Sequence, residues 1–302
     1  MKLEYMVVDV FTSTRFGGNP LAVVFDADDL TTEQMQTVAR EFNFSETSFV
    51  LTPKDANNTA HVRIFTASIE MPFAGHPNVG TAYALATRNE HHVEEMLFEE
   101  KAGLVSVRIA YDGDALSHTS IVAPLPLSVL QSLTCEEIAA VLSLHEADII
   151  TLTHPPQIAS VGAEFIIVEV ENRDCLKKIR FDFSAAERLN VPPSCDAIYV
   201  YTRDTDTVIA DTDVERDWTA RMFAFEEIPY EDPATGSASG AAVALVASLG
   251  VAPKNGDVYC LSQGVDMGRP SELYVRMLGE GVNARAEISG KTVTVMQGEI
   301  EI

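Results

Sequence analysis

Short apolar runs, separated by polar and glycine-rich segments, recur along the whole chain. Runs of this length, bounded by turn residues, are typical of β-strands rather than of helices. They predict strands over residues 5–11, 21–25, 48–51, 61–65, 97–100, 104–110, 165–170, 197–201, 208–210, 272–278, 284–288 and 292–296. The pattern therefore predicts a protein in which strands outnumber helices.

Helix signals lie between these strands. Residues 31–33 offer N-cap chemistry for a helix that runs through Glu41. Residues 127–142 carry a further predicted helix, capped by Thr134 and with two acidic residues in its first turn. Two more helices are favoured by runs of small residues, at 80–87 and 240–249.

Two segments, one in each half of the chain, share one pattern: 70–85 and 230–245. Both contain an acidic residue, then proline, glycine and small polar residues, and both end in an alanine-rich stretch. They lie about 160 residues apart, which is roughly half the chain. This weak repeat predicts two related domains, with a boundary near residues 117–126.

Length and charge restrict the possible partners. A chain of 302 residues fits two domains of about 150 residues. With 45 acidic residues against 21 Lys and Arg, the formal net charge is −24. We expect neither nucleic acid nor a membrane as a partner, because both surfaces repel a polyanion. A carboxylate substrate is still compatible, because helix starts attract anions locally.

The N-terminal sequence and the cysteines indicate a cytoplasmic protein. The first residues contain no basic segment followed by a long apolar one, so no secretory signal is predicted. The longest small-apolar stretch, 240–249, is far shorter than the roughly 20 residues of a membrane span. The four cysteines are scattered without a C-x-x-C pair, and we expect free thiols.

Each repeated segment places a glycine-rich loop directly before a helix. Such a loop exposes unpaired backbone N–H groups at the positive end of the helix dipole, and Gly75 and Gly236 permit a ligand to approach closely. Two such starts facing each other would hold a small carboxylate or an enolate-like oxyanion. Either loop alone is more often a tight connection. The pair, together with His76, Thr235 and Ser237, favours a site.

Other kinds of site lack their signatures. Residues 75–81 have the glycine spacing of a phosphate-binding loop but no lysine after the second glycine, which argues against a nucleoside triphosphatase. No G-x-G-x-x-G motif follows a strand, so a dinucleotide site has no support. The histidines show no ligand spacing, and we expect neither a metal nor a cofactor.

The candidates for proton transfer each have an ordinary alternative. Glu46 begins a strand among aromatic residues and small hydroxyls. Loss of hydration there would raise the pKa of its carboxyl toward the range useful for proton transfer at neutral pH. The ordinary alternative is a solvated glutamate at the edge of a strand. Asp232 precedes proline and either caps the next turn or accepts a substrate hydrogen bond. His76 is a relay or a turn residue. Ser237 is predicted to cap the helix, and it lacks a nucleophile elbow.

A set of motifs spans nearly the whole chain: residues 9–11, 16–24, 45–47, 63–66 with Glu70, 74–77, 231–238, 263–264 and 267–271. In this order they resemble the PhzF-like (phenazine-biosynthesis isomerase-like) family. The Gly-His-Pro and Asp-Pro-Ala-Thr-Gly-Ser segments are specific in combination.

The resemblance implies an α+β protein with the diaminopimelate-epimerase fold. Two similar domains would each form a mostly antiparallel, barrel-like sheet around a central helix. Residues 1–120, completed by a C-terminal strand at about 284–302, would form one domain, and residues 121–283 the other. The resemblance further implies a homodimer with its site in the interdomain cleft.

The implied activity is that of a cofactor-independent, metal-free isomerase that moves a proton on a small carboxylate. The residue roles carried over are catalytic for Glu46, His76 and Asp232, and substrate-binding for the remaining set: Gly75, Thr235, Gly236 and Ser237. The alternatives are a non-catalytic small-acid binding member of the fold or, less favoured, an epimerase or racemase.

The chain departs from the family pattern at two places. Ala67 and Asn78 stand where members often have proline and threonine, and both changes could reshape the pocket. The cysteine-dependent epimerases of this fold place a thiol in each glycine loop. Those positions hold Ala74 and Thr235, so two-thiol racemisation is not expected.

Overall fold

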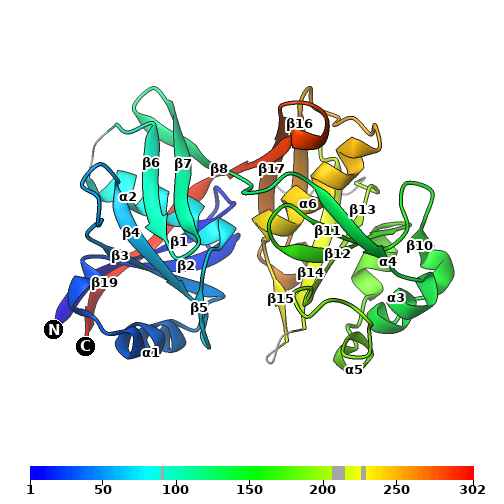
Figure 1. The fold of residues 1–302 in the computed structure, drawn as a ribbon, viewed down its shortest axis with the longest axis horizontal. Helices are drawn as coiled ribbons and strands as arrows, with labels where there is room; N and C mark the ends of the chain where they lie inside the picture. The colour runs from blue at the N-terminus through cyan, green and yellow to red at the C-terminus, as the bar shows by residue number, and fades with distance from the viewer. Residues whose placement is uncertain (90–91, 206–214, 226–228) are drawn as a thin grey trace. The chain divides into compact units, whose positions relative to one another are not determined.

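The computed structural model describes residues 1–89, 92–205, 215–225 and 229–302, and it divides into two compact units (Figure 1). Unit 1 comprises Met1–Val122 and Ser289–Ile302, and unit 2 comprises Ala123–Ile288. The strand predicted at 208–210 lies outside the described residues.

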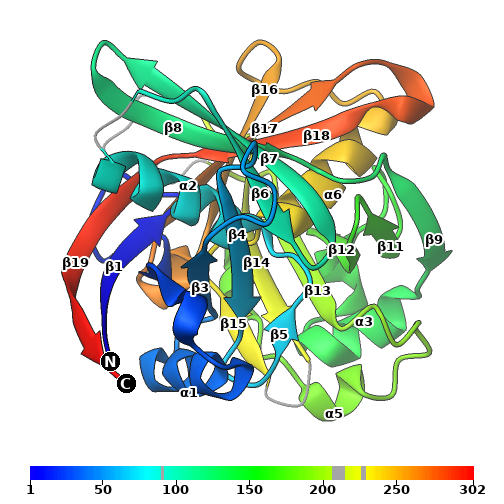
Figure 2. The same ribbon diagram turned by 60° about the vertical axis from the view of Figure 1, so that its left-hand side comes forward.

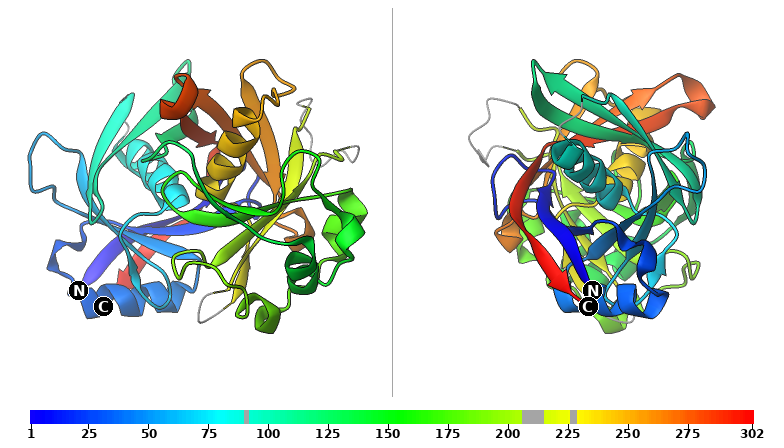
Figure 3. Two further views of the ribbon diagram at one scale, coloured as in Figure 1. Left: turned by 45° about the vertical axis from the view of Figure 1, so that its right-hand side comes forward. Right: turned by 90° about the vertical axis from the view of Figure 1, so that its left-hand side faces the viewer.

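Unit 1 is a sheet wrapped around one helix. Its strands, in hydrogen-bonding order, are β19 (Thr292–Glu301), β1 (Lys2–Val10), β2 (Asn19–Val24), β3 (Glu46–Leu51), β4 (Ala60–Phe65), β6 (Glu95–Glu100), β7 (Gly103–Asp112) and β8 (Ala115–Val122). All these neighbours are antiparallel except β2–β3 and β4–β6. Helix α2 (Gly75–Asn89) contacts strands from both ends of this order, so the sheet curls around it (Figure 3). A short strand, β5 (Glu70–Met71), pairs with β4 and leads into α2.

Unit 2 repeats this order. Its strands are β9 (Ser128–Ser132), β11 (Gln157–Ser160), β12 (Glu164–Val170), β13 (Ala197–Thr202), β14 (Trp218–Ala224), β16 (Val258–Gln263) and β17 (Ser271–Leu278). The parallel neighbours are β12–β13 and β14–β16, at the same places as in unit 1. The short β15 (Tyr230–Asp232) pairs with β14 and leads into α6 (Gly236–Ser248), which contacts β11, β12, β13 and β17. The predicted α+β class, with two similar and mostly antiparallel sheets around a helix, is confirmed.

A second apolar layer covers the outer face of each sheet. In unit 1, α1 (Thr32–Phe42) packs Met35 and Val38 against Phe49 of β3. In unit 2, α3 (Cys135–Leu142) and α4 (Arg173–Lys178) pack against β12 and β13. The remaining α-helix is α5 (Phe183–Ala186), and the remaining strands are β10 (Ile149–Ile150) and β18 (Arg285–Gly290). Short 3₁₀ helices lie at Ala27–Asp29, Glu146–Asp148, Val265–Met267 and Gly281–Asn283. Each sheet is therefore held between a central helix and outer helices.

The central helices are built from small residues because strands enclose them. In α6 every residue from Ala238 to Val246 is buried, and a helix buried on all sides must be apolar on all sides. In α2, a Cβ added at Gly80 would lie 2.6 Å from Leu21 Cδ2 and 2.8 Å from Val10 Cγ2. Gly80 therefore lets α2 lie directly on β1 and β2.

Both central helices begin earlier than predicted. Helix α2 starts at Gly75 instead of residue 80, and α6 starts at Gly236 instead of residue 240. Pro77 is no obstacle, because the first turn of a helix has no use for the N–H that proline lacks. The glycine motifs are thus the helix starts themselves and not loops ahead of them.

The prediction for residues 127–142 was wrong in its first part. Residues 128–132 form β9, and α3 begins only at Cys135. The predicted cap is correct: Thr134 and Glu137 form a capping box. The strand predicted at 292–296 continues to Glu301 and pairs with β1 along its length (Figure 2).

The four cysteines are free thiols, as predicted. Three of them, Cys175, Cys195 and Cys260, are buried. No helix in the described part of the chain is long and apolar enough to cross a bilayer.

Replacing Gly80 with alanine should destabilise unit 1. Gly80→Ala gains helix propensity of about 1 kcal/mol but presses its Cβ against the buried side chains of Leu21 and Val10, which must shift, with a net loss of roughly 1–3 kcal/mol. Gly240→Ala is the matched control in α6, where the nearest atom, Ile288 Cδ1, lies 3.1 Å from the added Cβ. Urea unfolding of both variants measures the difference, and equal losses would contradict this role of Gly80.

Candidate active site

Polar side chains converge at the start of α2 in unit 1. Asn19 is the first residue of β2 and Glu46 is the first of β3, and these parallel neighbours begin at the same edge of the sheet. His76 is the second residue of α2. Its Nδ1 lies 3.5 Å from Glu46 Oε2 and 3.5 Å from Asn19 Nδ2. The structure therefore brings together Glu46 and His76, two of the residues singled out in the sequence.

Burial decides the charge of His76. Its side chain is 6% exposed and that of Glu46 is 13% exposed. Desolvation lowers the pKa of His76 to about 3, although a hydrogen bond with the Pro20 carbonyl opposes this. The imidazole is neutral at physiological pH, so its contact with Glu46 is not an ion pair. A neutral imidazole orients its neighbours, and the carboxyl of Glu46 is the member of this pair suited to proton transfer.

In unit 2, Asp232 and the start of α6 form a closed set of hydrogen bonds. Thr235 Oγ1 donates to Asp232 Oδ2 at 2.5 Å. Gln263 Nε2 donates to Thr235 Oγ1 at 3.0 Å and to the Asp232 carbonyl at 2.8 Å. The N–H of Thr235 donates to Gln263 Oε1 at 3.2 Å. The N–H and the hydroxyl of Thr235 are thus both used in this set of hydrogen bonds, and the hydroxyl holds Asp232.

Backbone donors precede the hydrogen-bond ladder of α6. Ser239 N–H donates to the Thr235 carbonyl at 3.0 Å, and the N–H groups of Gly236 and Ser237 come before this first helical bond. They point out of the positive end of the helix, as the sequence predicted for an anion-holding start. The prediction that Ser237 caps the helix was wrong, because the N-cap position belongs to Thr235.

An arginine ties each loop to the sheet. Arg63 of β4 pairs with Glu70 at 2.7 Å, and Arg221 of β14 pairs with Glu231 at 2.8 Å. Each arginine also lies over the ring of the phenylalanine two residues further along its strand. The acidic residues of the repeat were recognised in the sequence, but their partners were not. The signal was present, because Arg-x-Phe occurs in both halves of the chain.

The two units carry their carboxyls at different positions. The phenylalanines of the two Arg-x-Phe motifs occupy the same place in both sheets, and this register aligns Glu46 with Ala197 and Met71 with Asp232. Each unit therefore has one candidate carboxyl where the other unit has an apolar residue. Residues that only stabilised the fold would have no reason to alternate in this way.

Glu100 is a polar residue of unit 1 that the sequence analysis missed. On β6, Met96 and Phe98 are buried, and strand alternation points Glu100 to the same inner face. Desolvation raises the pKa of Glu100 to about 8, and a hydrogen bond with Asn78 opposes this only in part. Glu100 is therefore mostly protonated at neutral pH. Its inward place in an alternating strand was the available signal.

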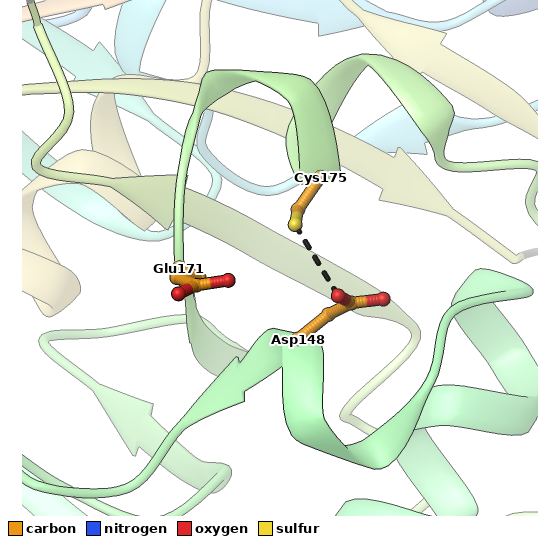
Figure 4. A group of neighbouring side chains, drawn as sticks. All are labelled: Asp148, Glu171 and Cys175. Carbon is orange, nitrogen blue, oxygen red and sulfur yellow. Dashed lines mark hydrogen bonds between the residues drawn. The ribbon is translucent and has the colours of Figure 1, made fainter.

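One group of metal-type side chains occurs among the described residues: Asp148, Glu171 and Cys175 (Figure 4). Their ligand atoms lie within 4.8 Å of one another. The Cys175 thiol donates to Asp148 Oδ1 at 3.5 Å, and burial raises the pKa of this thiol. Asp148 also accepts the N–H of His145, the N-cap residue of the short 3₁₀ turn Glu146–Asp148. The hydrogen bond between the thiol and Asp148, and the capping role of Asp148, give both groups a structural role in the fold.

The chain is similar to known proteins along nearly its whole length. A family model described as "Phenazine biosynthesis-like protein" matches residues 8–298. An uncharacterized isomerase of Mesorhizobium japonicum is 37% identical over 306 residues, which cover 99% of each chain. A trans-2,3-dihydro-3-hydroxyanthranilate isomerase of Pseudomonas fluorescens is 33% identical, over 98% of this chain and 99% of that one.

Solved structures show the same fold. A phenazine biosynthesis protein of the PhzF family from Bacillus anthracis matches with a TM-score of 0.84 and 27% identity over 100% of both chains. A hydroxyproline epimerase from Agrobacterium vitis matches with a TM-score of 0.62 and 14% identity, over 99% of this chain and 92% of that one. The second likeness shows the fold alone, and it confirms the predicted epimerase-like architecture.

Replacing Glu100 with glutamine, which does not ionise, should stabilise the protein at neutral and alkaline pH. Since the pKa of Glu100 is about 8 in the folded protein and ordinarily 4.5, the wild type loses stability as pH rises from about 4.5 to 8. Above pH 8, the free energy of unfolding of Glu100→Gln should exceed that of wild type by a few kcal/mol at most. Near pH 4 the two free energies should be equal.

Glu99→Gln is the control from the same strand. Hydrogen bonds from Asn58 and from the backbone of Asp55 and Lys54 lower the pKa of Glu99 to about 2. That variant should lose stability at neutral pH, and the loss should disappear as pH falls toward 2. Urea unfolding between pH 3 and 9 measures both, and parallel pH profiles for the two variants would contradict the assignment.

Proposed function

Because the chain is an isomerase of the phenazine biosynthesis-like protein family, we propose that it moves a proton within a small carboxylate substrate, without a cofactor. The observation that carries this proposal is the contact between the mostly buried carboxyl of Glu46 and the neutral imidazole of His76. Because His76 is neutral, it does not hold the Glu46 carboxyl in its ionised form, and Glu46 can both accept and return a proton.

In the proposed reaction, Glu46 removes a proton from the carbon next to an activating group. The same carboxyl then returns the proton at another carbon of the substrate. His76 has no hydrogen-bond partner at Nε2 among the described residues, so this nitrogen is free to contact the substrate. The charge that develops on the substrate is held by backbone donors, which is the usual means of stabilising an oxyanion.

We propose that both units act on one substrate, in the cleft that the family resemblance implies. Unit 2 would contribute Asp232 and the N–H groups of Gly236 and Ser237, and unit 1 would contribute Glu46, His76 and the start of α2 at Gly75. The alternation of carboxyls between equivalent positions supports this division, since one carboxyl from each unit gives a complementary pair. Thr235 would act by holding Asp232.

The substrate proposed is a small unsaturated or cyclic carboxylate. The Pseudomonas fluorescens relative is named for trans-2,3-dihydro-3-hydroxyanthranilate, which is one member of that class. Asn78 beside Glu100 departs from the family pattern and favours a substrate of different shape. A homodimer in the cytoplasm completes the proposal, as the resemblance implies, and sedimentation equilibrium tests its oligomeric part.

A two-thiol epimerase fits less well. Its thiol positions hold Ala74 and Thr235, and Thr235 is bonded inside its loop. Burial raises the pKa of Cys195 and of Cys260 to about 12, so both thiols stay protonated at neutral pH and cannot accept a proton from a substrate. A non-catalytic binding protein would not need a carboxyl shielded from water beside a neutral imidazole.

Solvent deuterium wash-in tests the role of Glu46. Wild-type protein in D₂O should incorporate deuterium into one or more members of a panel of amino and hydroxy carboxylates that includes trans-2,3-dihydro-3-hydroxyanthranilate. Glu46→Gln should lower the rate by about 10²-fold or more, the usual effect of losing a general acid–base group. Glu41→Gln, on an exposed residue of α1, is the matched control and should match the wild type. Equal incorporation by Glu46→Gln and wild type would remove Glu46 from the mechanism.

The charge of His76 is directly measurable. Because its pKa is lowered to about 3, the imidazole should stay neutral from pH 5 to 9 and contribute no limb to the pH profile of activity. ¹⁵N NMR of histidine-labelled protein follows both ring nitrogens of His76, with the exposed His145 as the reference signal. A His76 resonance that titrates between pH 5 and 8 would refute the neutral role.

A further inference from the structure

Gln263 is completely buried at the end of β16, and its side chain makes three hydrogen bonds to the loop that carries Asp232. The next residue, Gly264, has a φ of +72°, and an added Cβ would lie 2.6 Å from the Pro233 carbonyl oxygen. The strand therefore ends directly against the loop. Because the Gln263 amide is buried against this loop, its hydrogen-bond partners decide which way its oxygen and its NH₂ group point.

The orientation of the Gln263 amide follows from proton counting. The backbone N–H of Thr235 is a donor only, so it must face the amide oxygen, and the NH₂ group must face Thr235 Oγ1. The Thr235 oxygen then accepts from Gln263, which directs its single proton to Asp232 Oδ2. One carboxylate oxygen of Asp232 is thereby fixed as an acceptor.

This arrangement has no equivalent at the matching place in unit 1. The parallel pairs β4–β6 and β14–β16 share one register, and it aligns Glu100 with Gln263. In unit 1 the residue equivalent to Thr235 is Ala74, which has no hydroxyl to direct. Gln263 and Thr235 thus occur together in unit 2, next to Asp232.

We propose that Gln263 is a positioning residue of the candidate site, which acts through Thr235 to fix the Asp232 carboxylate in one orientation toward the substrate. The inference rests on the proposed function, because it takes Asp232 to contact the substrate. It adds a residue whose effect on the reaction is indirect.

A double-mutant cycle tests the proposal. Gln263→Leu and Thr235→Val should each lower kcat by about 10- to 100-fold with a smaller change in KM, and the double variant should lose no more than either single one. Gln131→Leu is the matched control, because Gln131 donates to the Asn190 carbonyl near the surface. Losses that multiply in the double variant would overturn the proposal.

Gln263→Glu gives a readout that a merely structural residue would not give. A protonated glutamate has one donor and one acceptor and replaces part of the amide, whereas an ionised one donates nothing and repels Asp232. The activity of this variant relative to wild type should rise as pH falls. A constant ratio from pH 5 to 9 would overturn the role assigned to the amide.

Hydrogen exchange separates failure of this proposal from failure of the proposed function. Without substrate, Gln263→Leu should speed amide exchange at Thr235 at least tenfold and leave residues 241–246 of α6 protected, as NMR or mass spectrometry measures. Unchanged exchange at Thr235 overturns the proposal whatever the enzyme does. Faster exchange in a protein whose wild type labels no carboxylate supports the hydrogen-bond arrangement and contradicts the proposed function.

Discussion

The burial of a whole helix inside a curled sheet is the constraint on which the rest of this structure depends. A helix that strands enclose has no polar face, so α2 and α6 consist of small residues, and their only strongly polar parts are their ends. The first N–H groups of each helix therefore need partners that the helix cannot provide. The Arg–Glu pairs at Glu70 and Glu231 fix the chain that enters each helix.

From this shared architecture the two halves have become different. Unit 1 has a carboxyl at the start of β3 and an imidazole in the first turn of α2. Unit 2 has alanine and serine at the equivalent places, and its carboxyl instead lies before the proline of the loop. A fold that needed these groups for stability would keep them in both units. The two units thus share one architecture but carry these groups at different positions.

Much of the fold could be predicted from the sequence because strand and helix-cap signals are local. The strand at Glu46, the cap at Thr134 and the free thiols all followed from short patterns. Strand β14 was missed because it is buried on both faces and shows no alternation, and both central helices were started too late because glycine and proline conceal a first turn. The contacts of Gln263 and Glu100 join residues far apart in the chain, so no local pattern contains them.

The carboxylate substrate proposed for this acidic protein requires that negative charge be limited where the substrate would lie. At the start of α2 burial serves this end, because desolvation raises the pKa of Glu100 to about 8 and so removes its charge at neutral pH. The same burial keeps His76 neutral, which spares Glu46 a fixed cation that would hold its proton away. With both neighbours uncharged, the helix start exerts its attraction on an anion with little opposition from these side chains. The formal charge of −24 therefore describes the surface of the protein and not the environment of Glu46.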